Sequence, residues 1–419
     1  MMTANFRFMI FITSVIILVS NTMPVFAGYD IAWTPRISIQ EEHDDNLYLA
    51  NDDGVSDWIT VVSPGLYLDI HSPVSMLFFD YEAGFTFYQK ESVNNTVRHN
   101  AFVDIHQHLF ESLELRITDR FIKWEDPIEI IDGVWGVRRT RNTYCRNVGE
   151  AQILHHFGDE NLFTMGYRNL LLENEDPLLD DSMNHNYFTE AVYWFNPSNG
   201  ISIEYAYNKG EFETYDDFKQ NEGKATLSHR FDLLTELCLG YAFSTMDLQG
   251  ANGDYHIHDW SLGITYTLPD DLSISLGTGY YIRRASGVED DDTYSLYAEL
   301  EKVFKRGFAK VGTTKGYDEN FFDAENLGFS MCWIVEGQGS YMLVENIALN
   351  LSGLFRNDVF PRPGVDREED RWEVGGGVAY TISEWCSAGI DYAYRERDSD
   401  IDLYDYTDNR FIFKLVFER

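Results

Sequence analysis

The last twelve residues of the chain, 408–419, alternate between apolar and polar side chains. The apolar positions, which share one face of an extended strand, are Phe411, Phe413, Leu415 and Phe417. Arg410 and Lys414 lie on the opposite face, and similar two-faced segments recur along the chain, for example at 79–88 and 372–382. A strand that is apolar on one side and polar on the other suits a wall between lipid and a water-filled lumen. We therefore predict an all-β fold, a transmembrane antiparallel up-and-down β-barrel.

The amino terminus has the features of an export signal. Arg7 precedes an apolar run at 8–19, and Val25-Phe26-Ala27 places small residues at the two positions that a signal peptidase reads. The apolar run is short for a membrane-spanning helix, which makes a single membrane anchor the weaker alternative. We predict a signal peptide at 1–27 and a single barrel domain at 28–419.

Short polar turns alternate with longer polar stretches along the chain, which is typical of barrels with short periplasmic turns and long outer loops. Nine short turns are expected near residues 72, 111, 158, 198, 232, 270, 306, 345 and 384. Ten longer stretches are expected at 42–57, 90–95, 125–141, 173–183, 213–221, 249–253, 286–292, 317–326, 358–370 and 398–405. Ten loops and nine turns predict about 20 strands, with 18 strands as the alternative.

Composition narrows the class of protein. A mean hydropathy of −0.31 with 24% charged residues excludes a helical membrane protein, and 15% aromatic residues suit the girdles of a barrel. A soluble β-sandwich array or solenoid is the competing fold. The net charge of −37 argues against a nucleic-acid partner, because phosphate binding needs clustered Lys and Arg.

The first mature segment carries a resemblance to a known family. Residues 41–49 read Glu-Glu-His-Asp-Asp-Asn-Leu-Tyr-Leu, and residues 56–68 read Ser-Asp-Trp-Ile-Thr-Val-Val-Ser-Pro-Gly-Leu-Tyr-Leu. This pattern resembles the opening hairpin of the second β-barrel porin family of bacterial outer membranes. The resemblance implies an outer-membrane barrel, in some cases linked to exopolysaccharide or protein-sorting systems, and it transfers no catalytic or binding residue. One departure is the ending Glu418-Arg419, where an aromatic residue would complete the assembly signal.

Alternation also predicts which charged and histidine side chains line the lumen. These candidates are Asp80, Glu82, Asp104, His106, His108, Arg116, Arg120, Arg168, Glu204, Arg283, Glu299, Arg356, Glu373, Asp391, Arg395, Arg410 and Lys414. The two signs are nearly balanced, which favours cross-strand ion pairs that brace a wide barrel over a cationic lumen for an anionic polymer. On this interpretation the excess negative charge lies mainly on the loops.

Other chemistry is weakly indicated. His106 and His108 beside Asp104 form the best candidate metal cluster, but we expect hydrogen bonding to neighbours and predict no metal site. The acidic loop at 44–54 lacks the closing Glu of a calcium loop, and the four widely spaced cysteines are expected to be structural. The chain has no G-x-S-x-G or H-E-x-x-H motif, so neither an enzyme nor a cofactor is predicted.

These features predict a channel in the bacterial outer membrane that passes small solutes or an extracellular polysaccharide. The alternative is a closed, non-conducting barrel that serves as a surface scaffold or docking partner. The expected partners are outer-membrane lipid, the barrel-assembly machinery and, from the resemblance, components of polysaccharide export. An empty lumen would favour the channel, and a filled one would favour the scaffold or a gated exporter.

Overall fold

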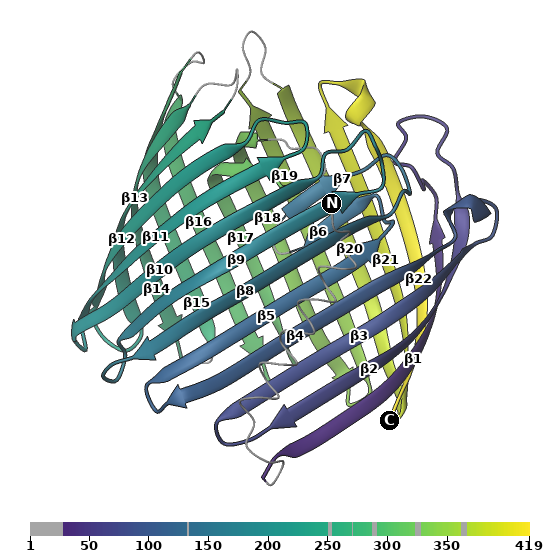
Figure 1. Ribbon diagram of the computed structural model, residues 1–419, viewed down its shortest axis with the longest axis horizontal. Helices are drawn as coiled ribbons and strands as arrows, with labels where there is room; N and C mark the ends of the chain where they lie inside the picture. The colour runs from purple at the N-terminus through teal and green to yellow at the C-terminus, as the bar shows by residue number, and fades with distance from the viewer. Residues whose placement is uncertain are drawn as a thin grey trace.

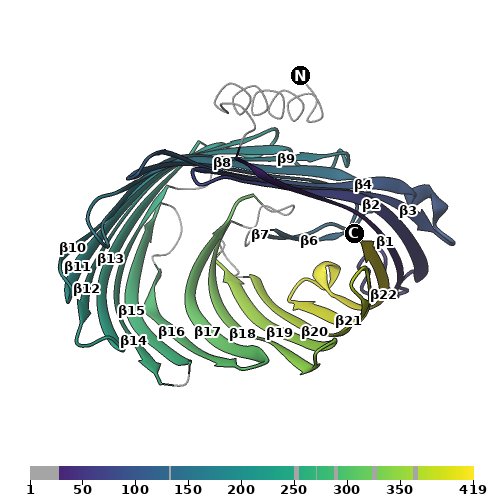
Figure 2. The same ribbon diagram turned by 90° about the horizontal axis from the view of Figure 1, so that it is seen from below.

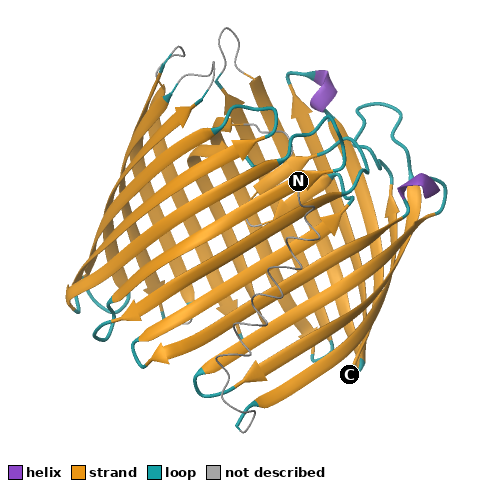
Figure 3. Cartoon of the chain, in the orientation of Figure 1, coloured by secondary structure: helices purple, strands orange, loops and turns teal. Residues whose placement is uncertain are grey.

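A computed structural model of the chain describes residues 28–131, 134–249, 254–269, 271–286, 291–322, 328–361 and 367–419 (Figure 1). The predicted signal peptide at 1–27 lies outside these residues. Strands form nearly all of the described fold, as the cartoon coloured by secondary structure shows (Figure 3). Among the described residues, no helix is long and apolar enough to cross a membrane.

Twenty antiparallel strands form one sheet, and the pairing of the first strand with the last closes it into a barrel. Each wall strand pairs with its neighbour in the chain, apart from β5, which pairs with β8. The wall strands are β1 (Asp30–Asp44), β2 (Asp57–His71), β3 (Ser75–Tyr88), β4 (Thr96–Phe110), β5 (Leu113–Trp124), β8 (Tyr144–His156), β9 (Leu162–Asn174), β10 (Ser182–Asn196), β11 (Asn199–Phe212), β12 (Phe218–Arg230), β13 (Thr235–Leu248), β14 (Tyr255–Leu268), β15 (Leu272–Ala285), β16 (Asp291–Phe304), β17 (Gly307–Asn320), β18 (Gly328–Val344), β19 (Ile347–Phe360), β20 (Arg367–Ser383), β21 (Cys386–Ser399) and β22 (Tyr406–Glu418). The predicted barrel of 20 strands is therefore confirmed, and the alternative of 18 is wrong.

Two further strands and two short helices lie in the connections. Strands β6 (Ile128–Ile131) and β7 (Val134–Val137) form a separate hairpin between β5 and β8. The single turns η1 (Ser92–Asn94) and η2 (Asp402–Tyr404) lie in two other long connections. Both chain ends of the barrel lie on the side of the nine short turns, which we call the inner side. The opposite side carries the ten longer connections and is called the outer side.

The strands have two chemically different faces because alternate side chains point to opposite sides of a sheet. One face of the barrel presents exposed aliphatic and aromatic side chains, including Leu239, Leu262, Leu351 and Phe411. An apolar band of this kind is the lipid-facing surface of a membrane barrel. The opposite face carries most of the charged strand residues and lines the lumen.

A repeated hydrogen bond on the lipid-facing side marks the membrane–water interface on the outer side of the barrel. In several hairpins a tyrosine hydroxyl forms a hydrogen bond with a polar side chain on the next strand. The partner lies two residues away from the residue that is directly opposite the tyrosine. These pairs are Tyr81–His99, Tyr167–His185, Tyr205–Asn221, Tyr241–His258, Tyr280–Asp292 and Tyr392–Asn409. Amphipathic rings at this depth form the aromatic girdle of such barrels.

The wall is interrupted in its outer half between β16 and β17. Their pairing runs only over Leu296–Phe304 and Gly307–Lys315, whereas β15 pairs with β16 up to Asp291 and β18 pairs with β17 up to Asn320. Just below the break, the Lys315 ammonium donates to the Tyr294 hydroxyl at 3.1 Å on the outward face. The outer part of β17 therefore departs from β16 close to the girdle, whereas β18 stays paired with β19 up to Met331.

Candidate functional site

Strand pairing identifies the residues that face the lumen. Directly opposed residues of an antiparallel pair share a face, and the pairing leads from Asp80 to Phe102 and then to Arg120. On β22 Arg410 is buried, whereas its neighbour Phe411 is 53% exposed on the lipid side. This register places all seventeen candidates on the inner face: Asp80, Glu82, Asp104, His106, His108, Arg116, Arg120, Arg168, Glu204, Arg283, Glu299, Arg356, Glu373, Asp391, Arg395, Arg410 and Lys414. Their part in selecting a solute stays a prediction.

Asp80 and Glu82 of β3 both pair with Arg36 of β1, a strand that does not pair with β3. The Arg36 guanidinium on β1 lies 2.8 Å from a carboxylate oxygen of Asp80 and 3.3 Å from one of Glu82, both on β3. The side chain crosses β2 at Gly65, where an added Cβ would stand 2.9 Å from Arg36 Nε and 2.9 Å from a backbone oxygen. Glycine at this position therefore permits an ion pair that spans three strands.

A second group joins His106 to acidic neighbours. His106 Nδ1 lies 2.6 Å from Glu114, and Nε2 lies 3.1 Å from Asp104, which is also 3.5 Å from Arg116 Nε. The candidate metal cluster thus combines histidine with a nearby guanidinium, an arrangement typical of an ion-paired network. His108, Arg120 and Arg168 lie outside these two groups.

The middle of the wall is more hydrated. Glu204 pairs with Lys224 at 3.1 Å, and these side chains are 41% and 51% exposed. Glu299 of β16 pairs with Lys310 of β17 at 2.8 Å, farther along the wall. Exposed pairs of this kind contribute little to stability, about 0–1 kcal/mol, so these residues stay accessible to ions in the lumen.

The register also places acidic residues on the inner face that the sequence analysis missed. Glu190 opposes Glu204, Asp259 opposes Tyr281, and Glu222 and Glu336 point to the same side. For Glu222 the alternation was weak because the outward positions of β12 include Lys219, Asn221 and Gly223, which carry no apolar signal. The same register adds the bases Lys224 and Lys310, which the four added acids outnumber. This part of the inner wall is therefore more acidic than the balanced list suggested, and the negative charge does not lie on the loops alone.

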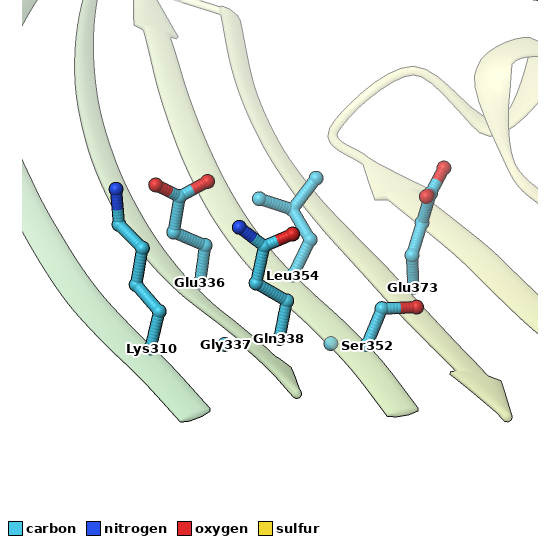
Figure 4. Close-up of a pocket in the computed structure, with 8 residues that line it drawn as sticks. Lys310, Glu336, Gly337, Gln338, Ser352, Leu354 and Glu373 are labelled. Carbon is cyan, nitrogen blue, oxygen red and sulfur yellow. The ribbon is translucent and has the colours of Figure 1, made fainter. Parts of the chain in front are cut away.

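One pocket in this wall shows its chemistry directly (Figure 4). It has a volume of about 220 Å³ and is lined by Lys310, Glu336, Gln338, Ser352 and Glu373 from four consecutive strands. The two carboxylates, the amide and the ammonium project from the same face of the sheet. The surface offered to a passing solute is polar, with two acids to one base.

The outer part of the lumen contains the connection between β5 and β8, which the sequence predicts as an outer loop (Figure 2). We call residues 125–131 and 134–143 the plug; its hairpin β6–β7 lies inside the ring of wall strands (Figure 2). Ile128 and Val137 of the plug pack with Leu49 and Tyr406 in a buried apolar cluster. The connection predicted at 125–141 therefore lies on the outer side as expected, but it folds back into the lumen, where these side chains find buried partners.

Ion pairs attach the plug to the wall on several sides. Arg410 donates to Asp126 at 2.5 Å, and its side chain is 5% exposed. Arg98 of β4 holds Glu125 at 2.6 Å, and Arg141 of the plug holds Asp44 of β1 at 2.5 Å. Each of these pairs is largely or fully buried. The plug is therefore held by buried ion pairs in which each charge has a partner of opposite sign.

Electrostatics in the plug favours the charged forms. Burial alone would raise the pKa of the Asp126 carboxyl, but the guanidinium groups of Arg410 and Arg141 hold this pKa well below its ordinary value. Burial would lower the pKa of Arg141, but Asp126 and the other acidic neighbours raise it. The contact therefore remains ionised over a wide pH range.

A second buried ionic cluster lies beside the plug on β20 and β21. Glu369 is fully buried and accepts from Arg397 at 2.9 Å and from Arg371 at 3.1 Å, and it also pairs with Arg367. Arg371 and Arg397 face each other directly across the two strands, so Glu369 offsets a like-charge contact. The outer rim is thus braced by arginines with a shared carboxylate.

Three carboxylates near the plug lie close enough to suggest a cation site. Oxygens of Asp44, Asp45 and Asp408 approach one another within 4.8 Å. Asp44 and Asp408 both pair with Arg410, at 3.3 and 3.1 Å, and Asp45 accepts from the Asn409 amide. Arginine and amide donors therefore compensate these acids.

The second inward element is the outer end of the β17–β18 hairpin, residues 316–322 and 328–330, which we call the inner hairpin (Figure 2). Glu319 on β17 accepts from Gln220 of β12 at 2.8 Å and from the Tyr255 hydroxyl of β14. The Phe322 carbonyl accepts from Arg146 of β8 at 2.9 Å, on the far side of the barrel. The hairpin therefore crosses the lumen.

Aromatic packing accompanies this crossing. The cluster on the inner face contains Phe218, Met246, Tyr255, Ile257, Tyr281 and Phe329. The Phe321 ring centroid lies 5.0 Å from that of Phe218, and Tyr317 meets Tyr281 edge-on at 4.8 Å. Arg283, a predicted lumen residue, covers the Phe329 ring at 4.2 Å. The Arg283 guanidinium therefore packs against the inner hairpin and does not line the open part of the lumen.

Comparisons with known proteins agree on the fold. No family model and no curated protein matches the chain. A variant of the ferric enterobactin receptor of Pseudomonas aeruginosa, solved with enterobactin, is similar over 92% of this chain and 81% of its own, with 8% identity and a TM-score of 0.54. The siderophore receptor PirA of the same organism gives 9% identity, 92% and 80% coverage, and 0.54. The outer membrane protein OpdK, also from that organism, covers 93% and 99% with 10% identity and a TM-score of 0.44.

The chain is therefore an outer-membrane β-barrel by architecture, with a closed antiparallel wall, an apolar outward band and a charged interior. The resemblance of its opening hairpin to the second β-barrel porin family stays a prediction.

Proposed function

We propose that the protein is an outer-membrane channel for small cationic or neutral solutes, narrowed on its outer side by the plug and the inner hairpin. The supporting observation is the acidic inner wall, where Glu190, Glu222, Asp259 and Glu336 add to the predicted lumen acids. Acidic side chains around a pore lower the barrier for cations and raise it for anions. An acidic polysaccharide would meet repulsion on this wall, so we favour small solutes over polymer export.

The test is conductance of the refolded full-length barrel in a planar bilayer, recorded in a salt gradient. We expect intermittent openings with a reversal potential on the cation side. Resistance to unfolding in detergent, measured on the same preparation, shows that the protein is folded. Stable anion preference would contradict the proposal.

A closed scaffold is the second candidate, and the buried ion pairs of the plug favour it. Arg98, Arg141 and Arg410 each hold a carboxylate with little or no solvent exposure. Silence from folded protein under every condition, including after the plug is loosened by mutation, would support a scaffold. Lipid, the assembly machinery and export components stay predicted partners.

A further inference from the structure

We propose that the inner hairpin is the movable gate of this barrel and that opening returns it to the wall beside β16. The inference rests on the proposed channel function. The first observation is the interrupted wall. Asp291–Ser295 of β16 pair with β15, and 316–320 of β17 pair with β18. In the described residues these two segments do not pair with each other. Unpaired edges of this kind are templates for strand pairing.

The register below the break shows how the two edges would meet. Leu296 pairs with Lys315, so continued pairing would place Ser295 opposite Gly316 and Thr293 opposite Asp318. A Cβ built on Gly316 already lies 4.0 Å from Ser295 Cβ, so the strands are still close at this level. The separation therefore starts at the next residues, and re-pairing needs no change of register.

Gly316 is the natural bending point. It lies at the last position where β16 and β17 are close, and an added Cβ there meets no other atom within 4 Å. Glycine inside a strand marks bends because it lacks a packed side chain and has wide backbone freedom. The lower part of β17, from Gly307 to Lys315, stays anchored in the wall on both sides.

The contacts that hold the hairpin inward reach across the lumen and are distinct from its contacts with β19, where Asp318 accepts from Arg356 at 2.9 Å. Glu319 binds Gln220 and Tyr255, and the Phe321 and Phe322 rings pack on Phe218. Moving outward would break these contacts and expose the aromatic cluster, while the edges of β16 and β17 would regain sheet hydrogen bonds. Two arrangements with compensating contacts are what a bistable element requires.

The motion would also change the lumen. A pocket of about 300 Å³ lies between the inner hairpin and the opposite wall, lined among others by Tyr317, Glu319, Glu190, Glu222 and Ser244. Return of Tyr317 and Glu319 toward β16 would merge this pocket with the rest of the lumen. The gate thus controls access to the acidic wall that supports cation passage.

The experiment locks each position in the full-length barrel after Cys145, Cys238, Cys332 and Cys386 are changed to serine. The inward lock is Gln220→Cys with Glu319→Cys, and the outward lock is Thr293→Cys with Asp318→Cys. A short bifunctional methanethiosulfonate reagent links each pair, and a reductant reverses the link. The control is Ser202→Cys with Thr226→Cys, which are directly opposed on β11 and β12.

We expect the outward lock to form and to give steady conductance at least tenfold above the inward lock, with both effects reversed by reduction and none in the control. Failure of the outward pair to link, or equal conductance with both locks, would overturn the gate. In either case, conduction by the barrel would still support the channel. Silence in both locks and in the control, with folded protein, would overturn the channel and the gate together.

Discussion

The plug and the inner hairpin both occupy the outer lumen, but they are held by different forces. The plug hangs between β5 and β8 and is tied to the wall by buried ion pairs, such as Arg410–Asp126 and Arg98–Glu125. The inner hairpin is continuous with two wall strands and is held mainly by aromatic packing around Phe218. Breaking a buried ion pair leaves an uncompensated charge, whereas an aromatic contact weakens gradually. We infer that the plug is a fixed element that narrows the lumen and that the hairpin is a movable one.

The largest expected effect is on the plug. Arg410→Gln would leave Asp44, Asp126 and Asp408 facing one another with less compensation, at a cost of about 3–5 kcal/mol in unfolding free energy. Urea unfolding of the refolded barrel in detergent measures this. The control is Arg230→Gln, whose partner Glu160 is 48% exposed, and which we expect to cost less than about 1 kcal/mol. Equal costs for the two variants would remove the distinction.

The next effect concerns the hairpin. Phe218→Ala deletes a side chain that is 2% exposed and contacts both Phe321 and Phe322. Such a deletion typically lowers the unfolding free energy by roughly 3–5 kcal/mol. We expect about 2 kcal/mol of this loss to destabilise the inward position of the hairpin relative to the outward one, which raises the open probability roughly 30-fold. Single-channel recording measures this. Phe102→Ala, on the inner face of β4 and against Phe78, should leave gating unchanged.

A smaller effect is expected at the hairpin's hydrogen bond. Tyr255→Phe keeps the ring and removes the donor to Glu319, which at about 1.5 kcal/mol favours opening roughly tenfold. Tyr280→Phe is a matched control because the Tyr280 hydroxyl also bonds a carboxylate, Asp292, but on the outward face. If both variants open the channel equally, the effect arises from the wall and not from the gate.

The smallest effect is a pH dependence that should be absent. The pKa of Asp126 is lowered in the folded state, so the stability from its ion pair is present above the ordinary carboxyl pKa and is lost as pH falls from there through the lower folded value. The unfolding free energies of wild type and Asp126→Asn should therefore differ by the same amount at pH 7 and at about pH 5, above the ordinary range. At about pH 3, below the ordinary carboxyl pKa, the difference should shrink because the unfolded carboxyl becomes protonated first. A difference that stays the same there as well would show that Asp126 has an ordinary pKa in the folded state.

Alternation along the sequence carried much of the fold. It predicted the barrel and the inner-facing positions because strand side chains alternate whatever the neighbouring strand is, and turn residues such as Gly158, at φ +79°, act locally. The plug was missed because the partners that draw it inward are remote: Asp126 and Arg410 are 284 residues apart. Nothing local distinguishes such a segment from a solvated loop.

The inner hairpin was equally hidden. Residues 316–320 continue the strand pattern of β17, and only their distant contacts with Gln220 and Tyr255 reveal that they leave the wall. Two residues on one strand can face the lumen from different sides of the hairpin, as Asp318 does toward Arg356 and Glu319 toward Tyr255. Alternation alone therefore could not assign Glu319 to the closure.

The central claim is that an acidic inner wall makes this barrel a cation-preferring channel behind a narrowed outer side. The most direct measurement is the reversal potential in a tenfold potassium chloride gradient, for wild type beside the variant Glu190→Gln, Glu222→Gln, Glu336→Gln. We predict cation preference in the wild type and a shift toward zero in the triple variant. A wild-type reversal potential on the anion side, or one that the triple substitution leaves unmoved, would contradict the account.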